Sequence, residues 1–327
     1  MLHLNPREKL EAIFKHGKPG HSPRALWRHF PHEDYQSEAF VAAQCDFIRR
    51  YRMDLCKITP RSSYGLRDYG AMDVFAGDYL GRPKYVNRVI TAAIQWESLP
   101  VLNPRHGCLQ QMLEITHAIV AQLGQEYPVI LTVFSPLTQA GNMTGIDALA
   151  SQWETNPASV RQGLAALTQS TIGFLEALKT TGIDGIYYAV QESNWPRAME
   201  NGLLEAAHPL NRAIMAAAGG WLNIIHVHGK GQQFADYARY PAQILHWDHH
   251  GSGIDTATGA RLFPGTVSGS IAWPLSDDPL GEESIRAQVR QALSSGLGSR
   301  ELLCSECVIP FETPARWIDA FFQASTL

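Results

Sequence analysis

The chain has 327 residues, of which 45% are hydrophobic and 18% are charged. This length suits one α/β barrel of ordinary size, and a chain this long can bury enough apolar surface to fold without cross-links. Lysine and arginine number 27 and aspartate and glutamate number 31, so the formal net charge is −4 and nothing favours a nucleic-acid partner. No apolar run is long enough to cross a membrane, and five sparse cysteines are typical of a reduced, cytoplasmic protein.

Eight short apolar runs alternate with amphipathic segments, which is typical of a parallel sheet covered by helices. The predicted strands are 25–30, 54–59, 129–134, 185–190, 223–228, 243–247, 266–272 and 301–308. The predicted helices are 38–51, 110–123, 157–180, 203–218, 283–297 and 313–324.

Eight strands with intervening helices predict a (β/α)8 TIM barrel. The long segment 60–127, between the second and third strands, predicts an insertion of loops and a helix that covers the barrel mouth. An open doubly wound sheet is the alternative, but no glycine-rich phosphate-binding sequence follows an early strand. No repeat or linker divides the chain, so we expect one domain over residues 1–327.

Side chains that bind metals gather at the predicted strand ends, where barrel enzymes place their active sites. His226 and His228 are two residues apart on the fifth strand and therefore point to the same side. Cys307 lies at the end of the eighth strand, across the barrel mouth. Two imidazoles and one thiolate leave a fourth position open, as catalytic zinc requires. Two hydrogen-bonded pocket histidines and an inert core cysteine are the alternative.

Cys304 competes with Cys307 for this role. The two cysteines are three residues apart and so face opposite sides of a strand; we assign Cys307 to the mouth and Cys304 to the core.

Other strand-end residues are candidates for chemistry or substrate binding. Asp248 follows the sixth strand and is a candidate for orienting a ligand histidine or for proton transfer, with a loop-capping role as the alternative. Glu192 is a candidate fourth ligand or proton donor, or else a solvated loop residue. The candidate substrate-binding residues are Arg28, Arg61, Ser135 and Trp273, although structural salt bridges are equally expected for the two arginines.

The order of several weak motifs resembles the uroporphyrinogen decarboxylase superfamily over nearly the whole chain. Residues 5–10 and 23–27 resemble its opening helix and first strand, and 134–138 resembles its G-P-x-T segment, with Gly145 downstream. Residues 182–186 resemble the G-A-D strand entry, 244–248 a strand that ends in aspartate, and 265–271 the G-N-L-D-P strand. Residues 307–314 resemble the closing G-C-G-I-P-x-x-T-P.

The resemblance favours the methyltransferase branch of that superfamily. The haem-pathway decarboxylases carry R-Q-A-G-R and F-S-D stretches, whereas the matching residues here, 26–31 and 58–63, lack the paired arginines and the aspartate. The corrinoid-linked methyltransferases bind zinc through H-x-C on strand five and a cysteine on strand eight, which His226 and Cys307 match. His228 replaces a thiolate by imidazole, which raises the Lewis acidity of the metal.

The resemblance therefore implies a zinc-dependent methyltransferase that acts on a small methylated substrate or a corrinoid. A decarboxylase or dehydratase on the same scaffold is one alternative, and a non-catalytic tetrapyrrole- or corrinoid-binding protein is another. The expected partners are a small-molecule substrate and a corrinoid protein, with no nucleic acid and no membrane, and the chain is a candidate homodimer.

Overall fold

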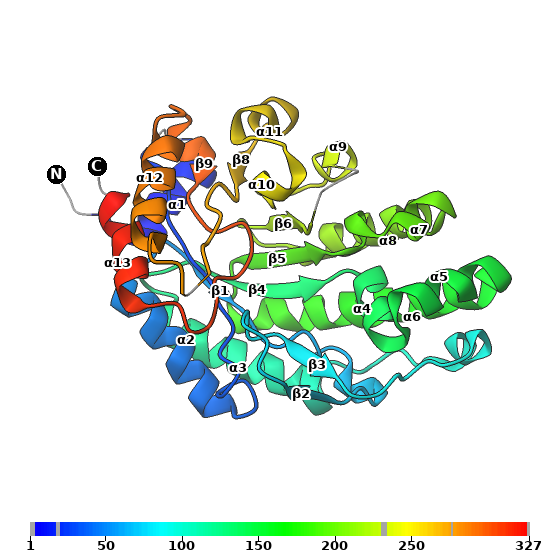
Figure 1. Cartoon of the computed structure of the whole chain (residues 1–327). Helices are drawn as coiled ribbons and strands as arrows, with labels where there is room; N and C mark the ends of the chain where they lie inside the picture. Colours follow the sequence, from blue (N-terminus) through cyan, green and yellow to red (C-terminus); the bar gives the residue numbers. More distant parts are fainter. Residues whose placement is uncertain (1–3, 18–19, 230–233, 276, 326–327) are drawn as a thin grey trace.

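Seven parallel strands form one curved sheet in the centre of the molecule (Figure 1). The structure is a computed structural model that describes residues 4–17, 20–229, 234–275 and 277–325. The strand order is β1-β4-β5-β6-β7-β8-β9, and every pair of neighbours is parallel. The strands are β1 (Cys56–Ile58), β4 (Val129–Phe134), β5 (Gly185–Val190), β6 (Ile224–Val227), β7 (Ile244–Trp247), β8 (Thr266–Ser268) and β9 (Glu301–Leu302).

The extended segment around Arg24 links the two edges of this sheet. Arg24 forms a parallel bridge with Leu303, and the Asp54 N–H, next to β1, donates to the Arg24 carbonyl at 2.8 Å. The segment thus takes the place of the first barrel strand. The sequence predicted a strand over 25–30, but the carbonyl of Trp27 accepts from the N–H of Ile309, in the loop after β9, and no ladder forms there.

Two other predicted strands are also shorter than expected. β8 ends at Ser268 because Gly269 has a φ of 106°, which turns the chain out of the sheet. β9 ends at Leu302, and an isolated bridge between Ile271 and Ser305 continues the contact between the last two chain segments.

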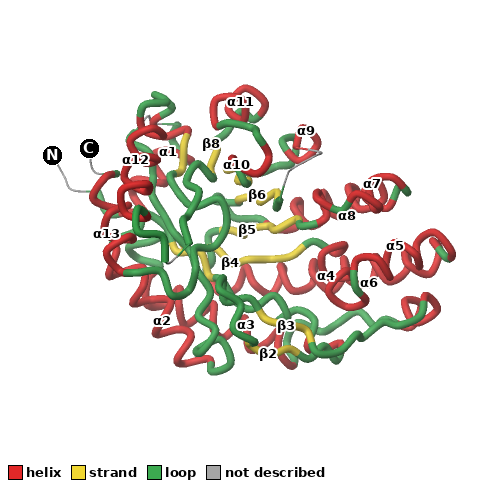
Figure 2. The backbone as a smooth tube through the Cα atoms, in the orientation of Figure 1, coloured by secondary structure: helices red, strands yellow, loops and turns green. Residues whose placement is uncertain are grey.

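Helices cover the outside of the sheet, as the tube drawing in Figure 2 shows. The central strands are apolar along their whole length, and every residue of β4 and β5 is buried, which is typical of strands covered on both sides. α2 packs against α3, α6 against α8, and α12 against α13. These helices are α2 (Ser37–Tyr51), α3 (Gly107–Leu123), α6 (Pro157–Leu178), α8 (Leu203–Ala218), α12 (Gly281–Leu293) and α13 (Ala315–Ala324).

The chain between β1 and β4 contains α3 and a short antiparallel hairpin. The hairpin pairs β2 (Asp73–Phe75) with β3 (Pro83–Tyr85), and two 3-10 helices flank it, η1 (Arg67–Tyr69) and η2 (Ala93–Ser98). The remaining short helices are α1 (Pro6–Phe14), α4 (Pro136–Thr144), α5 (Ile146–Thr155), η3 (Lys179–Thr181), η4 (Glu192–Asn194), α7 (Pro196–Glu200), α9 (Phe234–Tyr237), α10 (His249–Ser252), α11 (Thr256–Leu262) and η5 (Gly298–Arg300).

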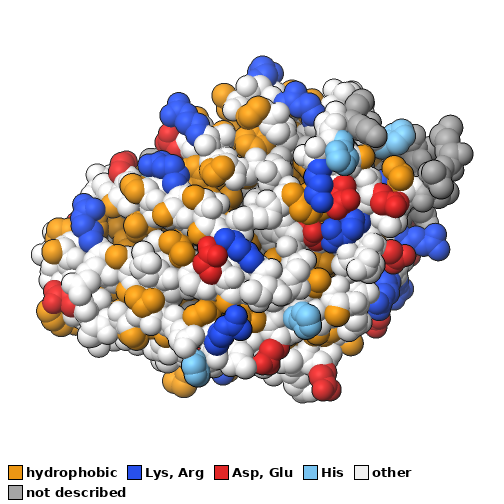
Figure 3. Space-filling model, turned by 180° about the vertical axis from the view of Figure 1, so that it is seen from behind, with side chains coloured by type: hydrophobic (Ala, Val, Ile, Leu, Met, Phe, Trp, Pro, Cys, Tyr) orange, Lys and Arg blue, Asp and Glu red, His pale blue; other side chains and the backbone are white. Residues whose placement is uncertain are grey.

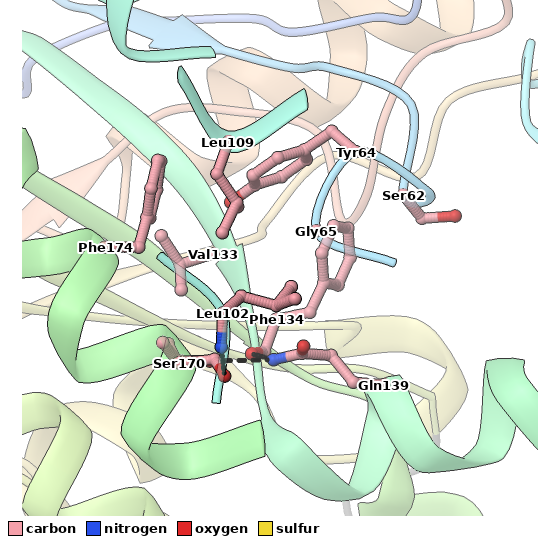
Figure 4. A pocket seen from close by; sticks show the side chains of 11 residues that line it. Ser62, Tyr64, Gly65, Leu102, Leu109, Val133, Phe134, Gln139, Ser170 and Phe174 are labelled. Carbon is pink, nitrogen blue, oxygen red and sulfur yellow. Dashed lines mark hydrogen bonds between the residues drawn. The ribbon is translucent and has the colours of Figure 1, made fainter. Parts of the chain in front are cut away.

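A small cavity of about 30 Å³ lies beside β4 and is shown in Figure 4. Its polar groups bond to protein partners: the Leu102 N–H donates to Ser170 Oγ at 2.9 Å, and the Gln139 amide donates to Phe134 O at 2.9 Å. The Tyr64 hydroxyl donates to the carbonyl of a β4 residue at 2.9 Å. A space this small with satisfied walls belongs to the packing of the core.

Basic and acidic side chains are interspersed over the face of the molecule shown in Figure 3. This mixture agrees with the nearly balanced charge of the sequence. Within the described residues, no helix is both long and apolar enough to cross a membrane.

Candidate metal centre

His226, His228 and Cys307 meet at the ends of β6 and β9. The two histidines share one side of the chain at the end of β6, and Cys307 lies in the loop after β9. Their ligand atoms all lie within 4.8 Å of one another. His226 Nε2 is 3.4 Å from His228 Nδ1, and Cys307 Sγ is 4.0 Å from the same nitrogen. Within the described chain, no other three or more histidine, cysteine or acidic residues form a candidate metal site.

His246 on β7 sets the protonation of the first ligand. His246 Nε2 lies 2.8 Å from the carbonyl oxygen of Ser305, which can only accept, so Nε2 carries the proton. Burial lowers the pKa of His246 to about 3, so its ring is neutral and Nδ1 is an acceptor. His226 Nδ1 lies 2.6 Å from that acceptor and must donate to it. His226 Nε2 is then left with a free lone pair, and this is the atom that faces His228.

The pKa shifts of His226 and Cys307 favour the forms that bind a metal, whereas the shift of His228 favours its protonated form. Burial lowers the pKa of His226 well below its ordinary value, and the neighbouring His246 and His228 add to this effect. Burial also acts to lower the pKa of His228, but the hydrogen bond with Cys307 and its charge outweigh burial and raise it. For the Cys307 thiol, burial acts to raise the pKa, and the bond with His228 outweighs it, so the pKa is lowered. A neutral His226 and a thiol inclined to ionise are the states that coordinate zinc.

The cluster opens into a pocket of about 640 Å³. Its lining also includes residues of the hairpin β2–β3 and of β1, β4 and β5. A volume of this size accommodates a small organic molecule. The polar lining outside the cluster includes His29, Lys57, Thr59, Asp78, Arg82, Lys84, Tyr187 and Gln191.

Cys304 and Asp248 lie near the cluster but do not join it. Cys304 is fully buried, and its sulfur lies 2.8 Å from Ser268 Oγ. Asp248 caps α10 by accepting the Gly251 N–H at 2.6 Å. Its negative charge also contributes to the raised pKa of His228.

Glu192 and Ser135 belong to a separate buried network. The Ser135 hydroxyl donates to Glu192 Oε2 at 2.7 Å, and the Thr138 hydroxyl donates to the same oxygen at 2.8 Å. The Asn211 amide lies 3.3 Å from the other oxygen. Glu192 has no exposed surface, and neither it nor Ser135 lines the 640 Å³ pocket.

Arg28, Arg61 and Trp273 lie outside the residues that line this pocket. Arg28 donates to the carbonyl of Phe311 at 2.8 Å and stacks over aromatic rings. Arg61 lies 4.2 Å from the ring centre of Tyr35. Trp273 packs against the core beside α13. Each of these side chains therefore has protein contacts of its own in this structure.

Sequence reasoning missed His246, Tyr187 and Lys57. All three belong to apolar runs that predict buried strands, and their polar ends were therefore overlooked. Lys57 offered a usable signal, because an unpaired lysine in a buried strand is rare.

The sequence profile of the family described as uroporphyrinogen decarboxylase (URO-D) matches residues 22–326. The chain belongs to this family. No protein of curated function matches the chain in sequence.

Two solved structures show the same fold. A methyltransferase from Methanosarcina mazei superposes with a TM-score of 0.85 at 14% identity, over 99% of both chains. A B12-independent methionine synthase from Shewanella sp. W3-18-1, in complex with selenomethionine, superposes with a TM-score of 0.61 at 12% identity, over 93% of both chains. The superpositions establish a shared fold. Because the sequence identities are low, the chemistry of this chain must be argued from its own residues.

Proposed function

We propose that this chain is a zinc-dependent methyltransferase of the URO-D family whose metal ligands are His226, His228 and Cys307. The observation that carries the proposal is the convergence of the three ligand atoms within 4.8 Å in the lining of a substrate-sized pocket. Bound there, zinc would supply a Lewis acid with one coordination position left for substrate. The fold shared with a methyltransferase and a methionine synthase supports methyl transfer over other chemistry on this scaffold.

The protein's own residues fit this ion. The bond from His226 to His246 leaves a nitrogen lone pair facing the cluster, and the Cys307 thiol is inclined to ionise. Two imidazoles and one thiolate are ligands that zinc prefers. The pairing of a ligand histidine with a second polar group is also a usual feature of zinc sites.

Asp248 does not line the pocket, and it is our candidate for tuning protons in this reaction through its charge on His228. Its charge reaches His228, while its bond to the Gly251 N–H holds the carboxylate in place. Asp248→Asn keeps this shape and should slow turnover by about 10²- to 10⁴-fold, with zinc content unchanged. For Glu192, Ser135, Arg28, Arg61 and Trp273, the bonds and packing described above support structural roles.

Metal analysis of protein purified without added metal tests the proposal. We expect about one zinc per chain, because three ligands with an open fourth position are the usual set of a catalytic site. Cys307→Ser should weaken zinc binding by more than about 100-fold, since one of only three protein ligands is lost. Cys304→Ser is the matched control and should leave zinc binding unchanged, because that sulfur bonds to Ser268. Metal-free protein that takes up no added zinc would overturn the proposal.

The activity is tested with methylcobalamin as methyl donor and a small thiol as acceptor. The change in the corrinoid spectrum measures the reaction. Demethylation that depends on zinc and is lost in Cys307→Ser supports methyl transfer. Zinc-dependent release of CO₂ or water from a small acid, without methyl transfer, would support the lyase alternative instead.

A further inference from the structure

Lys57 places a positive charge inside the barrel. It is the middle residue of β1, between Cys56 and Ile58, and is 3% exposed. Because side chains alternate along a strand, Lys57 and Thr59 share the side that lines the 640 Å³ pocket. The Lys57 Nζ atom donates to the Thr59 hydroxyl at 3.1 Å, which confirms this direction.

No carboxylate lies beside this charge within the described part of the chain, and the charge of the Cys307 thiol offsets only part of the effect of burial on the Lys57 pKa. No Asp or Glu oxygen there lies within 4.0 Å of Lys57 Nζ. The amine lies instead 4.2 Å from the ring centre of Tyr187 and 5.2 Å from that of Trp27. Burial lowers the pKa of Lys57 to about 7. Aromatic faces offset only part of the cost of burying an ammonium group, so the protein alone leaves this cation poorly stabilised.

The other basic side chains of the pocket are placed differently. Arg82 is paired with Asp78 at 2.8 Å, and Lys84 is exposed on the outer hairpin β2–β3. Burial lowers the pKa of His29 to about 3, so its ring is neutral. Lys57 is therefore the buried cation of the pocket that has no carboxylate partner, and it lines the same pocket as the metal-ligand cluster.

We propose that Lys57 binds the carboxylate of the substrate, so that the substrate is a small carboxylic acid whose other end reaches the cluster of His226, His228 and Cys307. This inference deepens the proposed function. The contact between the substrate and the cluster rests on that function, whereas carboxylate binding at Lys57 does not. One ammonium group matches the single charge of a carboxylate, whereas a phosphate dianion needs several donors. The ring of Tyr187, which lines the pocket, suits the short apolar chain of such an acid.

Matched ligands on cobalt(II)-loaded protein test the inference. Mercaptopropionate and mercaptopropanol differ only in their charged or neutral end, and a thiolate bound to cobalt(II) is seen in the visible spectrum. We expect the acid to bind on the order of tenfold more tightly than the alcohol, as one charge-assisted hydrogen bond predicts. The pair one methylene shorter, mercaptoacetate and mercaptoethanol, tests the distance between the two ends.

Variants assign the preference to Lys57. Lys57→Met removes the charge but keeps an unbranched side chain, and it should abolish the preference for the acid while leaving the affinity for the alcohol unchanged. Lys84→Met removes a charge from the rim of the same pocket and should keep the preference. Equal binding of acid and alcohol by the unaltered protein, or an undiminished preference in Lys57→Met, overturns the inference.

Failure of the metal site is distinguishable from failure of this inference. If cobalt(II) does not bind, the proposed function fails, and calorimetry with the same ligands on metal-free protein then measures the anion site alone. A preference for the acid that Lys57→Met removes still supports the role of Lys57. If the metal-free protein shows no preference for the acid, the role of Lys57 is overturned. The comparison of the two ligands on the unaltered protein needs no variant, so it holds even if Lys57→Met does not fold.

Discussion

His246 contacts the candidate metal centre through His226, without belonging to the three candidate ligands. It accepts the His226 Nδ1 proton at 2.6 Å and donates its own to Ser305. His246→Phe keeps an aromatic ring of similar size but removes the acceptor, which frees His226 to place its proton on either nitrogen. We therefore expect zinc affinity to fall by about 10- to 100-fold, measured by competition with a chelator.

Tyr187→Phe is the matched control for His246. The Tyr187 hydroxyl also approaches His246 Nδ1, at 2.9 Å, but its removal leaves the bond between the two histidines in place. Zinc affinity should change less than about threefold in this variant. A result in which both variants bind zinc as the unaltered protein does would show that His246 is only a packing residue.

His29 makes the stability of the protein sensitive to acid. Burial lowers its pKa to about 3, whereas an unfolded histidine titrates near 6.5. Between these values the unfolded chain binds the proton and the folded chain does not, so stability falls as pH drops below about 6.5. His29→Gln should reduce the loss of unfolding free energy between pH 7 and pH 5 by about 2 kcal/mol. Urea denaturation at the two pH values measures this, and an unchanged difference would contradict it.

The three residues of the candidate metal centre could be predicted from the sequence, whereas the residues around them could not. His226 and His228 stand out because two histidines two residues apart share one side of a strand. His246 gives no such signal, because it lies singly in the apolar run of β7 and gains its role only by pairing with His226 across two strands. Asp248, which the sequence suggests for this role, follows β7 and turns back to cap α10.

At the scale of elements, Gly269 determines where β8 ends. Its φ of 106° is unfavourable for other residues, and an added Cβ would collide with the carbonyl oxygen of Trp247 on β7. Gly269→Ala should therefore lower the free energy of unfolding by about 3 kcal/mol or more, measured by urea denaturation. Gly77→Ala is the control, since Gly77 has a φ of 81° but open space around it, and should cost about 1 kcal/mol. If both substitutions lower the free energy of unfolding by the same amount, the positive φ alone would explain the loss at Gly269.

The sequence predicted long helices and strands more reliably than short ones. β4 and β5 match the predicted strands 129–134 and 185–190, because continuous apolar runs are specific to buried parallel strands. The hairpin β2–β3 was not predicted, since its strands have three residues each and β3 begins with a proline. The segment 25–30 has a strand-like composition, but its backbone partners come from the loop near Ile309, which no local pattern reveals.

At the scale of the whole molecule, curvature of the sheet brings together the residues of the candidate metal centre. β6 and β9 are three positions apart in the strand order, so Cys307 approaches His228 only because the sheet curls round. Arg24 supports this closure: its backbone bridges to Leu303, and its side chain lies 3.6 Å from the carboxylate of Asp54 beside β1. The order of motifs along the sequence predicts such a barrel, while the exact distances between its strand ends require the folded chain.

Because the cluster joins strands that are distant in the sequence, zinc should stabilise the folded protein as a whole. An unfolded chain does not hold His226, His228 and Cys307 together, so binding favours the folded state. At free zinc about 1,000-fold above the dissociation constant, the gain is about 4 kcal/mol. For a chain of this length, that gain raises Tm by about 6 °C. Calorimetry with and without zinc measures the shift, which should fall to about 2 °C or less in Cys307→Ser and persist in Cys304→Ser. A shift of equal size in both variants would mean that zinc binds the folded protein elsewhere.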